Sequence, residues 1–220
     1  MQEMHRTLIG VWRTDKEILG SSRYVQVAAA FFAMFVISPY QYAWSSMSAR
    51  LGGAYGWSHE QIALLFTFYV IFQSLGMLPG GMLIDRFGPR LSIGFSAVPA
   101  SMGLFALTLG PNFILVSSLW CLGSFFTGFI FIGTISITNK WFYDKRGVMI
   151  GLVAGAFSWG SVPFIFSIRA ISLHAPVSAL WHIIDIMTAL ISIVGVISAL
   201  FMKNPPLGWW RIRTVSVLQP

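Results

Sequence analysis

Charge is what this sequence has least of. Only 10% of its 220 residues are charged, whereas hydrophobic residues make up 56%. Because a soluble domain carries about 25% charged residues, the composition excludes an ordinary water-soluble globular protein. Apolar runs of about 20 residues, the length that a helix needs to cross a bilayer, recur along the chain. The sequence therefore predicts an integral, multi-pass membrane protein whose surroundings are the lipid bilayer.

Cysteine and the side chains of common catalytic or metal sites are also scarce. The single cysteine, Cys121, excludes an intramolecular disulfide and lies within an apolar run. The histidines are not spaced as a zinc site on one helical face requires. The sequence contains no nucleophile elbow and no phosphate-binding loop. We therefore expect no metal and no cofactor, and we expect that the protein is not an enzyme.

The apolar runs predict six membrane-spanning helices. The runs lack the alternation with a period of two that barrel strands show, and a helix satisfies its backbone hydrogen bonds within one segment. We expect an all-α membrane protein with a bundle over residues 24–202 and tails over residues 1–23 and 203–220. The runs are 24–44, 62–84, 91–109, 113–138, 148–168 and 183–202.

Lysine and arginine are distributed unevenly between the two sides of the predicted bundle. If the N-terminus is cytoplasmic, all but two of the 14 basic residues, Arg50 and Arg169, fall on cytoplasmic segments. The first 23 residues contain no apolar core of signal-peptide type. We expect a plasma (inner) membrane protein with both termini in the cytoplasm. The net charge of +7 then needs no nucleic-acid partner to explain it.

Residues 81–90, GMLIDRFGPR, combine charge with glycine between two apolar runs. Gly88 permits a sharp reversal of the chain. Asp85 lies near the positive end of the following helix, and Arg86 and Arg90 can bridge to carboxylates or to helix C-termini. A simple turn on the cytoplasmic side explains the arginines, but it explains neither Asp85 nor the glycine spacing.

This turn resembles the signature loop between helices 2 and 3 of the major facilitator superfamily, G-x-L-x-D-R-x-G-x-R. The matching residues are Gly81, Asp85, Arg86, Gly88 and Arg90. In that superfamily the charge cluster latches two six-helix halves together on the cytoplasmic side. The resemblance therefore implies gating roles for these five residues, and Gly81 is also expected to let its helix approach a neighbour.

Further segments are similar to the oxalate:formate antiporter family and its monocarboxylate-transporter relatives. They are YQYAWS at 40–45, WS at 57–58, WFYDKRG at 141–147 and NPPLGW at 204–209. The resemblance implies secondary active transport of a small organic anion by alternating access. Members have twelve helices in two halves, so we expect this chain to be an N-terminal half that lacks a C-terminal half or pairs with a second copy.

Neutral polar and aromatic side chains are the candidates for substrate binding, because Asp185 is the only ionisable residue within the runs. They are Gln41, Tyr42, Tyr69, Gln73 and Trp159. Tyr69 and Gln73 share one helical face. An amide that faces lipid is costly, so each glutamine is expected to face a cavity or to bond a neighbouring helix. For Tyr42 an interfacial aromatic belt is the alternative, and for Asp185 a helix-start position.

Two pairs of glycines, Gly76 with Gly80 and Gly151 with Gly155, have the spacing of close helix contacts. Static packing and a sliding contact between moving parts both remain open for them. Two other functions also remain open: an inactive truncated fragment, and a membrane subunit that needs a partner half. Residues 211–220 do not resemble the central loop that joins the halves of a full transporter, which favours the fragment.

Overall fold

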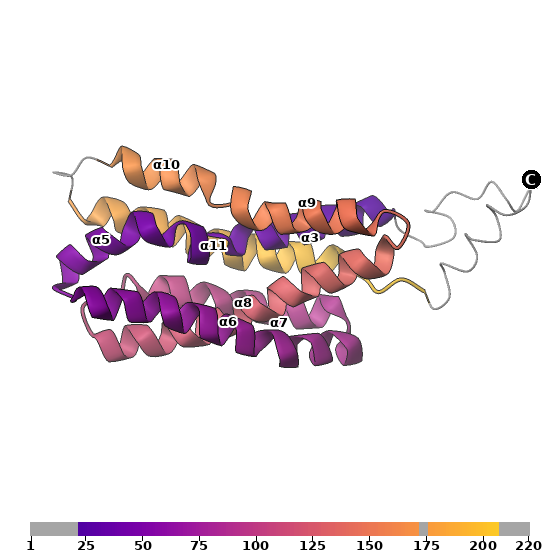
Figure 1. Ribbon diagram of the computed structural model, residues 1–220, viewed down its shortest axis with the longest axis horizontal. Helices are drawn as coiled ribbons and strands as arrows, with labels where there is room; N and C mark the ends of the chain where they lie inside the picture. The colour runs from indigo at the N-terminus through magenta and orange to yellow at the C-terminus, as the bar shows by residue number, and fades with distance from the viewer. Residues whose placement is uncertain (1–21, 172–175, 207–220) are drawn as a thin grey trace, which may run out of the picture.

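The computed structural model describes residues 22–171 and 176–206, which are almost entirely helical and contain no strand. The helices form an elongated bundle along a common axis (Figure 1). Most of both predicted tails, and residues 207–209 of the resemblance, lie outside the described residues. The helices are α3 (Arg23–Ile37), α4 (Pro39–Tyr42), α5 (Trp44–Tyr55), α6 (His59–Phe87), α7 (Pro89–Ala106), α8 (Phe113–Trp141), α9 (Arg146–Trp159), α10 (Val162–Ala170) and α11 (Ser178–Phe201).

Five segments of the described bundle, two of which consist of two consecutive helices, are long and apolar enough to cross a membrane. The segments that meet this requirement are Arg23–Tyr42, His59–Phe87, Phe113–Trp141, Arg146–Ala170 and Ser178–Phe201. The helix α7, which corresponds to the predicted third crossing, has 18 residues and carries Arg90 near its start. The all-α membrane fold is confirmed, and five of the six predicted crossings meet the requirement by length and composition.

The chain reverses direction at the two ends of the bundle (Figure 1). One end, here called the Asp85 end, holds the start of α3, the α6–α7 turn, the α8–α9 connection and the end of α11. The opposite end, here called the Trp57 end, holds the α5–α6 and α7–α8 connections. The start of α3 and the last residue of α11 therefore lie at the same end of the bundle, as an even number of crossings requires.

Two of the predicted runs are interrupted helices. Residues 24–44 divide into α3, α4 and the start of α5, which continues to Tyr55, so the predicted helix end at Trp44 is wrong. Residues 148–168 divide into α9 and α10. Pro39 and Pro163 occupy the first turns of α4 and α10, because proline lacks an amide hydrogen and clashes with a preceding helical turn.

The α6–α7 reversal is tighter than the sequence predicts. The helix α6 continues to Phe87 and α7 starts at Pro89, so most of the predicted loop at residues 81–90 is helical. Gly88 alone separates the two helices, with φ +82 and ψ 166. That φ lies in the region that glycine adopts readily and other residues avoid, which explains the glycine at this position.

Helix starts at the Trp57 end follow local capping signals. The Ser58 hydroxyl accepts from the Gln61 amide at 3.3 Å, and Gln61 Oε1 accepts from the Ser58 amide at 2.9 Å. This reciprocal pair is the capping box that the sequence SHEQ encodes. Asn112 Oδ1 accepts from the Leu115 amide at 3.2 Å and starts α8 in a similar way.

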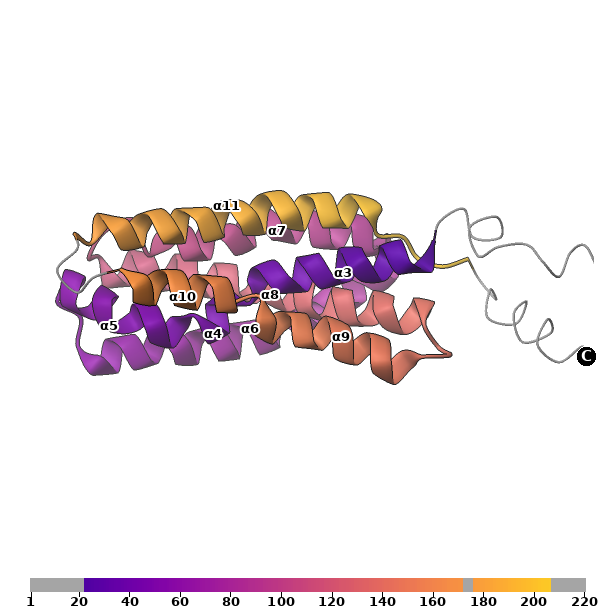
Figure 2. The same cartoon turned by 90° about the horizontal axis from the view of Figure 1, so that it is seen from above.

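The helix α8 lies at the centre of the packing and contacts α3, α6, α7 and α9. The grouping of α7 with α11, and of α9 with α3, can be followed in Figure 2. At Gly76 an added methyl group would overlap the backbone carbonyl of Phe125 on α8, and at Gly80 it would lie 2.9 Å from Phe129 Cα. The predicted close contact of Gly76 and Gly80 is confirmed.

The predictions for Gly81, Gly151 and Gly155 are not confirmed. A methyl group added at Gly81 would lie 3.9 Å from its nearest neighbour on α8, an ordinary contact, so Gly81 does not provide the close approach. At Gly151, nothing in the described part of the chain lies within 4 Å of such a group. Gly151 and Gly155 therefore do not form a close helix contact within the described bundle, contrary to the prediction.

Candidate functional site

The predicted polar residues of the first and second crossings meet in the middle of the bundle. The Tyr69 hydroxyl on α6 donates to Gln41 Oε1 on α4 at 3.4 Å. Gln41 is half-buried and Tyr69 is buried. The short helix α4, placed by the interruption at Ser38, brings Gln41 toward α6. Among the described residues, no hydrogen bond occupies the NH2 group of Gln41, which can donate to an anion.

Gln73, unlike Gln41, donates its side-chain amide to a neighbouring helix. Its Nε2 donates to Thr127 Oγ1 on α8 at 3.4 Å, and both side chains are buried. The Thr127 hydroxyl in turn donates to the Ser124 carbonyl at 2.7 Å. Gln73 thus links α6 to α8 where Gly76 lets their backbones meet, and it does not face an open space in this conformation.

Tyr42 and Trp159 lie on the surface of the described bundle. Tyr42 is 39% exposed and packs edge-on against Phe157 of α9, with ring centroids 5.5 Å apart. Trp159 is 55% exposed, and its ring is tilted against Phe31 of α3 at 6.4 Å. Both rings flank the region where α3 and α4 pack against α9. Tyr42 and Gln41 are neighbours on α4, so this exposed aromatic surface adjoins the Gln41–Tyr69 pair.

Tyr40 packs against Tyr69 on the buried side of the Gln41–Tyr69 pair. Its buried hydroxyl donates to the Ala100 carbonyl of α7, and its ring stacks on Tyr69 at 5.5 Å with an interplanar angle of 24°. An added methyl group at Gly103 or Gly123 would collide with the Tyr40 hydroxyl. These glycines therefore form the space for a tyrosine that orients Tyr69.

The interruptions of the first and fifth crossings meet each other. The hydroxyl groups of Ser38 and Ser161 are hydrogen-bonded in the buried contact between these two breaks. An added methyl group at Gly160 would overlap the Phe35 carbonyl. The side-chain hydroxyl groups of the two irregular segments thus satisfy each other, as buried polar groups usually do in proteins.

Asp85 pairs with a residue of this same chain. Lys140 Nζ, at the end of α8, lies 2.8 Å from Asp85 Oδ1 at the end of α6. The Asp85 side chain is 70% exposed, so water weakens this attraction. Arg86 lies over the Phe87 ring at 5.3 Å, and both Arg86 and Arg90 are exposed. The structure gathers four of the five predicted gating residues at one turn, with Gly81 two turns back on α6.

The Asp85 end contains a second ion pair, between Arg23 and Asp144, that was not predicted from the sequence. Arg23 NH1, at the start of α3, donates to both carboxylate oxygens of Asp144, at 2.9 and 3.0 Å. Its guanidinium also lies over the Phe142 ring at 4.7 Å. Because 121 positions separate the partners, no local spacing signals this contact. A basic residue that directly precedes an apolar run was the only available hint.

Gln26 and Trp141 hold the end of α11. Gln26 Nε2 donates to the Phe201 carbonyl at 2.9 Å, and Gln26 Oε1 accepts from the Lys203 amide at 2.8 Å. Trp141 Nε1 donates to the Lys203 carbonyl at 2.7 Å. These side chains satisfy backbone groups that a helix end leaves without partners, so α3, α8 and α11 are fixed together at the Asp85 end.

The arrangement offers neutral hydrogen-bond donors in the middle of the bundle and charged groups at one end. Asp185 is exposed but lies two turns into α11, which starts at Ser178 and has no acidic residue in its first turn, so the predicted helix-start position of Asp185 is wrong. Within residues 22–171 and 176–206, no cluster of histidine, cysteine, aspartate or glutamate could hold a metal ion. Such a site can bind and orient a small polar solute and contains no arrangement for covalent catalysis.

Comparison with known proteins gives several similar sequences. The chain is 35% identical over 145 residues to an uncharacterized 38 kDa protein in the 23S RNA operon of Thermoproteus tenax, covering 64% of this chain and 39% of that protein. It is 26% identical over 148 residues to the oxalate:formate antiporter of Oxalobacter formigenes, covering 67% and 35%. It is 27% identical over 187 residues to the nitrate/nitrite transporter NrtP of Nostoc punctiforme, covering 82% and 36%.

These matches extend over little more than a third of each relative. The family model described as Major Facilitator Superfamily matches residues 26–216, which is most of the chain. Members of this family are transporters and not enzymes, and the matched range contains both the Gly88 turn and the polar residues around Tyr69. This all-helical, multi-pass membrane chain belongs to the Major Facilitator Superfamily.

Proposed function

We propose that this chain forms half of a secondary transporter that exchanges small organic anions, of the oxalate, formate or monocarboxylate type, by alternating access. The resemblance of residues 40–45, 141–147 and 204–209 to the oxalate:formate antiporter family supports this substrate class. The similarity to the oxalate:formate antiporter of Oxalobacter formigenes supports it further. Inorganic nitrate is the competing anion, because a nitrate/nitrite transporter is also similar.

The Gln41–Tyr69 pair is the observation that carries this proposal. A hydrogen bond of 3.4 Å is long, so a carboxylate can replace it at small cost. The Gln41 NH2 group and the Tyr69 hydroxyl would then donate to the anion, as neutral donors can. Tyr42 and Trp159 would provide the apolar walls of this half of the cavity. Gln73 would join the site when its contact with Thr127 opens.

The Asp85 end is proposed to face the cytoplasm, with both termini on that side of a plasma (inner) membrane. The exposed basic residues Arg86, Arg90 and Lys145 lie at this end, in keeping with the positive-inside rule. Asp85, Arg86 and Arg90 would contact the other half when the transporter closes on this side. Gly88 would allow the tight turn that presents these side chains.

A partner half is proposed to cover the open faces of α6 and of α9–α10. Only 22% of the α6 crossing and 28% of the Arg146–Ala170 crossing is buried within this chain. Gly151 lies on this open surface without a neighbour within 4 Å in the described residues. A C-terminal half or a second copy of this chain would complete the pathway. An inert fragment is the alternative.

Binding of labelled oxalate, formate and lactate to the purified chain in detergent tests the substrate class. We expect saturable binding that unlabelled organic anions displace and that Gln41→Leu or Tyr69→Phe weakens. Thr67→Ala is the matched control, because Thr67 is exposed on α6 and bonds only its own helix, donating to the Ala63 carbonyl at 3.0 Å. Displacement by nitrate alone, or equal loss in the control, would contradict the proposed substrate class.

A further inference from the structure

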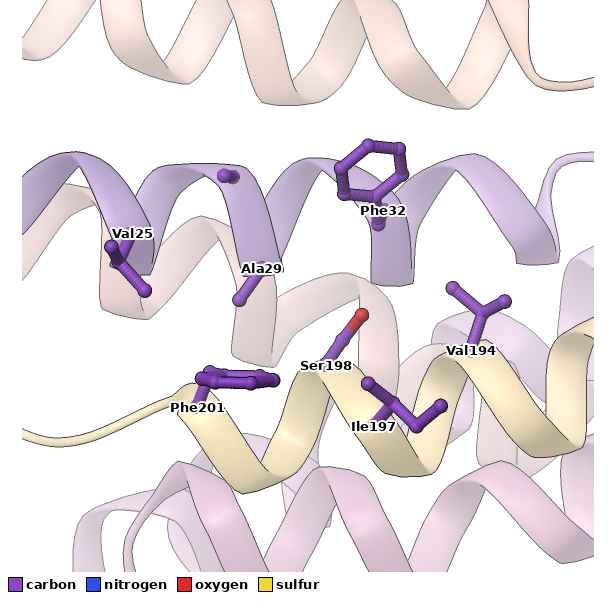
Figure 3. Close-up of a pocket in the computed structure, with 8 residues that line it drawn as sticks. Val25, Ala29, Phe32, Val194, Ile197, Ser198 and Phe201 are labelled. Atoms are coloured by element: carbon purple, nitrogen blue, oxygen red, sulfur yellow. The ribbon is translucent and has the colours of Figure 1, made fainter.

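An apolar groove lies between α3 and α11, in the half of the bundle near the Asp85 end. It has a volume of about 250 Å³. Figure 3 shows side chains of the two helices facing each other across it. Its lining is aliphatic or aromatic except for one hydroxyl group. The lining residues are Val25, Ala28, Ala29, Phe32, Val194, Ile197, Ser198 and Phe201.

Ser198 supplies the hydroxyl group in this groove. The residue is only 4% exposed, and in Figure 3 its oxygen points from α11 toward α3. Other buried serines, such as Ser96 and Ser124, donate to the carbonyl one turn back at 2.6 Å. Among the described residues, no hydrogen bond engages the Ser198 hydroxyl. The Ser198 oxygen is not one of the fully buried atoms that lack a partner, so it is accessible from the groove, where the hydroxyl group can donate to an acceptor atom.

Lys203 lies just beyond the groove at the Asp85 end. Its backbone is fixed on both sides, since its amide donates to Gln26 and its carbonyl accepts from Trp141. Its side chain is exposed. Ser198 lies three residues before Phe201, the last residue of α11, which corresponds to about 4.5 Å along the helix. The apolar lining extends to both sides of the Ser198 hydroxyl, and the Lys203 ammonium group lies beyond Phe201, toward the membrane surface.

We propose that this groove binds an anionic glycerophospholipid of the leaflet at the Asp85 end. One acyl chain lies along the apolar lining, and the Ser198 hydroxyl donates to the ester carbonyl of that chain. The Lys203 ammonium group pairs with the phosphate. A phospholipid carries hydrocarbon, ester and phosphate in the order in which the deeper lining at Phe32 and Val194, the Ser198 hydroxyl and the Lys203 ammonium group would meet them. A helix of another protein is 10–12 Å wide with its side chains and would not reach Ser198.

The charge specificity is tested by the lipid that stays bound to the full chain. The protein is purified from nanodiscs of equal phosphatidylglycerol and phosphatidylcholine, stripped with increasing detergent, and its retained lipid is counted by native mass spectrometry. We expect one phosphatidylglycerol to remain longest on the wild type. Lys203→Gln should weaken the preference for phosphatidylglycerol about fivefold. Lys145→Gln, at another exposed lysine of the same end, should leave the preference unchanged.

The position of the acyl chain is tested by filling the groove. Ala28→Phe places a ring among the lining residues and should abolish selective retention, whereas Ala189→Phe, at an exposed residue of α11 outside the groove, should not. Ser198→Ala should lower retention of both lipids. Thermal unfolding identifies any variant that fails to fold. If Ala28→Phe or Ser198→Ala fails to fold, the comparison of Lys203→Gln with Lys145→Gln tests the proposal. Unchanged retention in Ala28→Phe, or equal retention of both lipids by the wild type, would overturn the proposal.

Discussion

Replacing glycine by alanine at Gly76 and at Gly151 should change stability in opposite directions. Both residues lie on membrane-crossing helices, and both start a G-x-x-x-G pair. At Gly76 the new methyl group meets the Phe125 backbone carbonyl of α8. At Gly151 it meets nothing within 4 Å among the described residues. The substitution is the same, so the difference isolates the helix contact.

The expected magnitudes follow from these surroundings. A backbone carbonyl cannot rotate away as a flexible side chain can, so α6 must move from α8, and overpacking of this kind costs about 1–3 kcal/mol. The same shift lengthens the Gln73–Thr127 hydrogen bond, which is already 3.4 Å. In open space, alanine gains up to about 1 kcal/mol over glycine from helix propensity. We therefore expect Gly76→Ala to destabilise the chain and Gly151→Ala to stabilise it slightly.

Equilibrium unfolding of the purified chain in mixed micelles, followed by circular dichroism, measures both effects. The difference in the free energy of unfolding between the two variants should be about 1–3 kcal/mol, which is the overpacking cost, because the gain in helix propensity is common to both variants. Gly81→Ala, with its nearest contact at 3.9 Å, serves as a control on α6 and should resemble Gly151→Ala. Equal stability of Gly76→Ala and Gly151→Ala would refute the assignment of the α6–α8 contact.

Three further predictions concern the polar contacts. Asp144→Ala should lower the free energy of unfolding by about 3 kcal/mol, because it leaves the Arg23 side chain, which is 5% exposed, without this carboxylate. Asp85→Asn should cost less than about 1 kcal/mol in the same measurement, because the pair with Lys140 is largely exposed. Tyr40→Phe should cost about 1 kcal/mol, because its buried hydroxyl loses a hydrogen bond. A larger loss for Asp85→Asn than for Asp144→Ala would reverse this ranking of the two ion pairs.

Features that depend on neighbouring residues could be predicted from the sequence. Apolar runs of membrane-spanning length identified the crossing helices. In lipid every backbone N–H and C=O group must be hydrogen-bonded within the protein, and few structures other than a helix achieve this. The capping box at Ser58 follows from the identity of two residues three positions apart. Gly88 was predicted as the reversal because few other residues adopt its φ of +82. In each case a local steric or hydrogen-bonding rule determines the structure.

Features that depend on distant residues could not be predicted. The two glycine pairs have the same spacing, and only the position of α8 distinguishes the packed pair from the open one. Arg23 and Asp144 are 121 positions apart, and their pairing follows from the return of the chain to the Asp85 end. The sequence identified Gln73 as an amide that needs a partner, but it left a neighbouring helix and a substrate cavity as alternatives, and Thr127 follows only from the packing of α6 against α8.

The arrangement of the candidate site residues therefore follows from the sequence only in part. Gln41 and Tyr69 do meet, and Tyr42 lies beside them. The sequence did not indicate that Tyr40 is buried behind Tyr69, because an aromatic residue near a helix end is equally typical of the membrane interface. Its partners, the Ala100 carbonyl and the space made by Gly103, come from another helix.

Exchange of labelled oxalate, formate and lactate by liposomes that contain the purified chain tests the central claim most directly. The account predicts saturable uptake that requires an organic anion inside the vesicle. Gln41→Leu should abolish this exchange and Thr67→Ala should preserve it, while Asp85→Asn should stop exchange without preventing binding. Folded and inserted protein that exchanges none of these anions, either alone or together with a C-terminal half, would contradict the account.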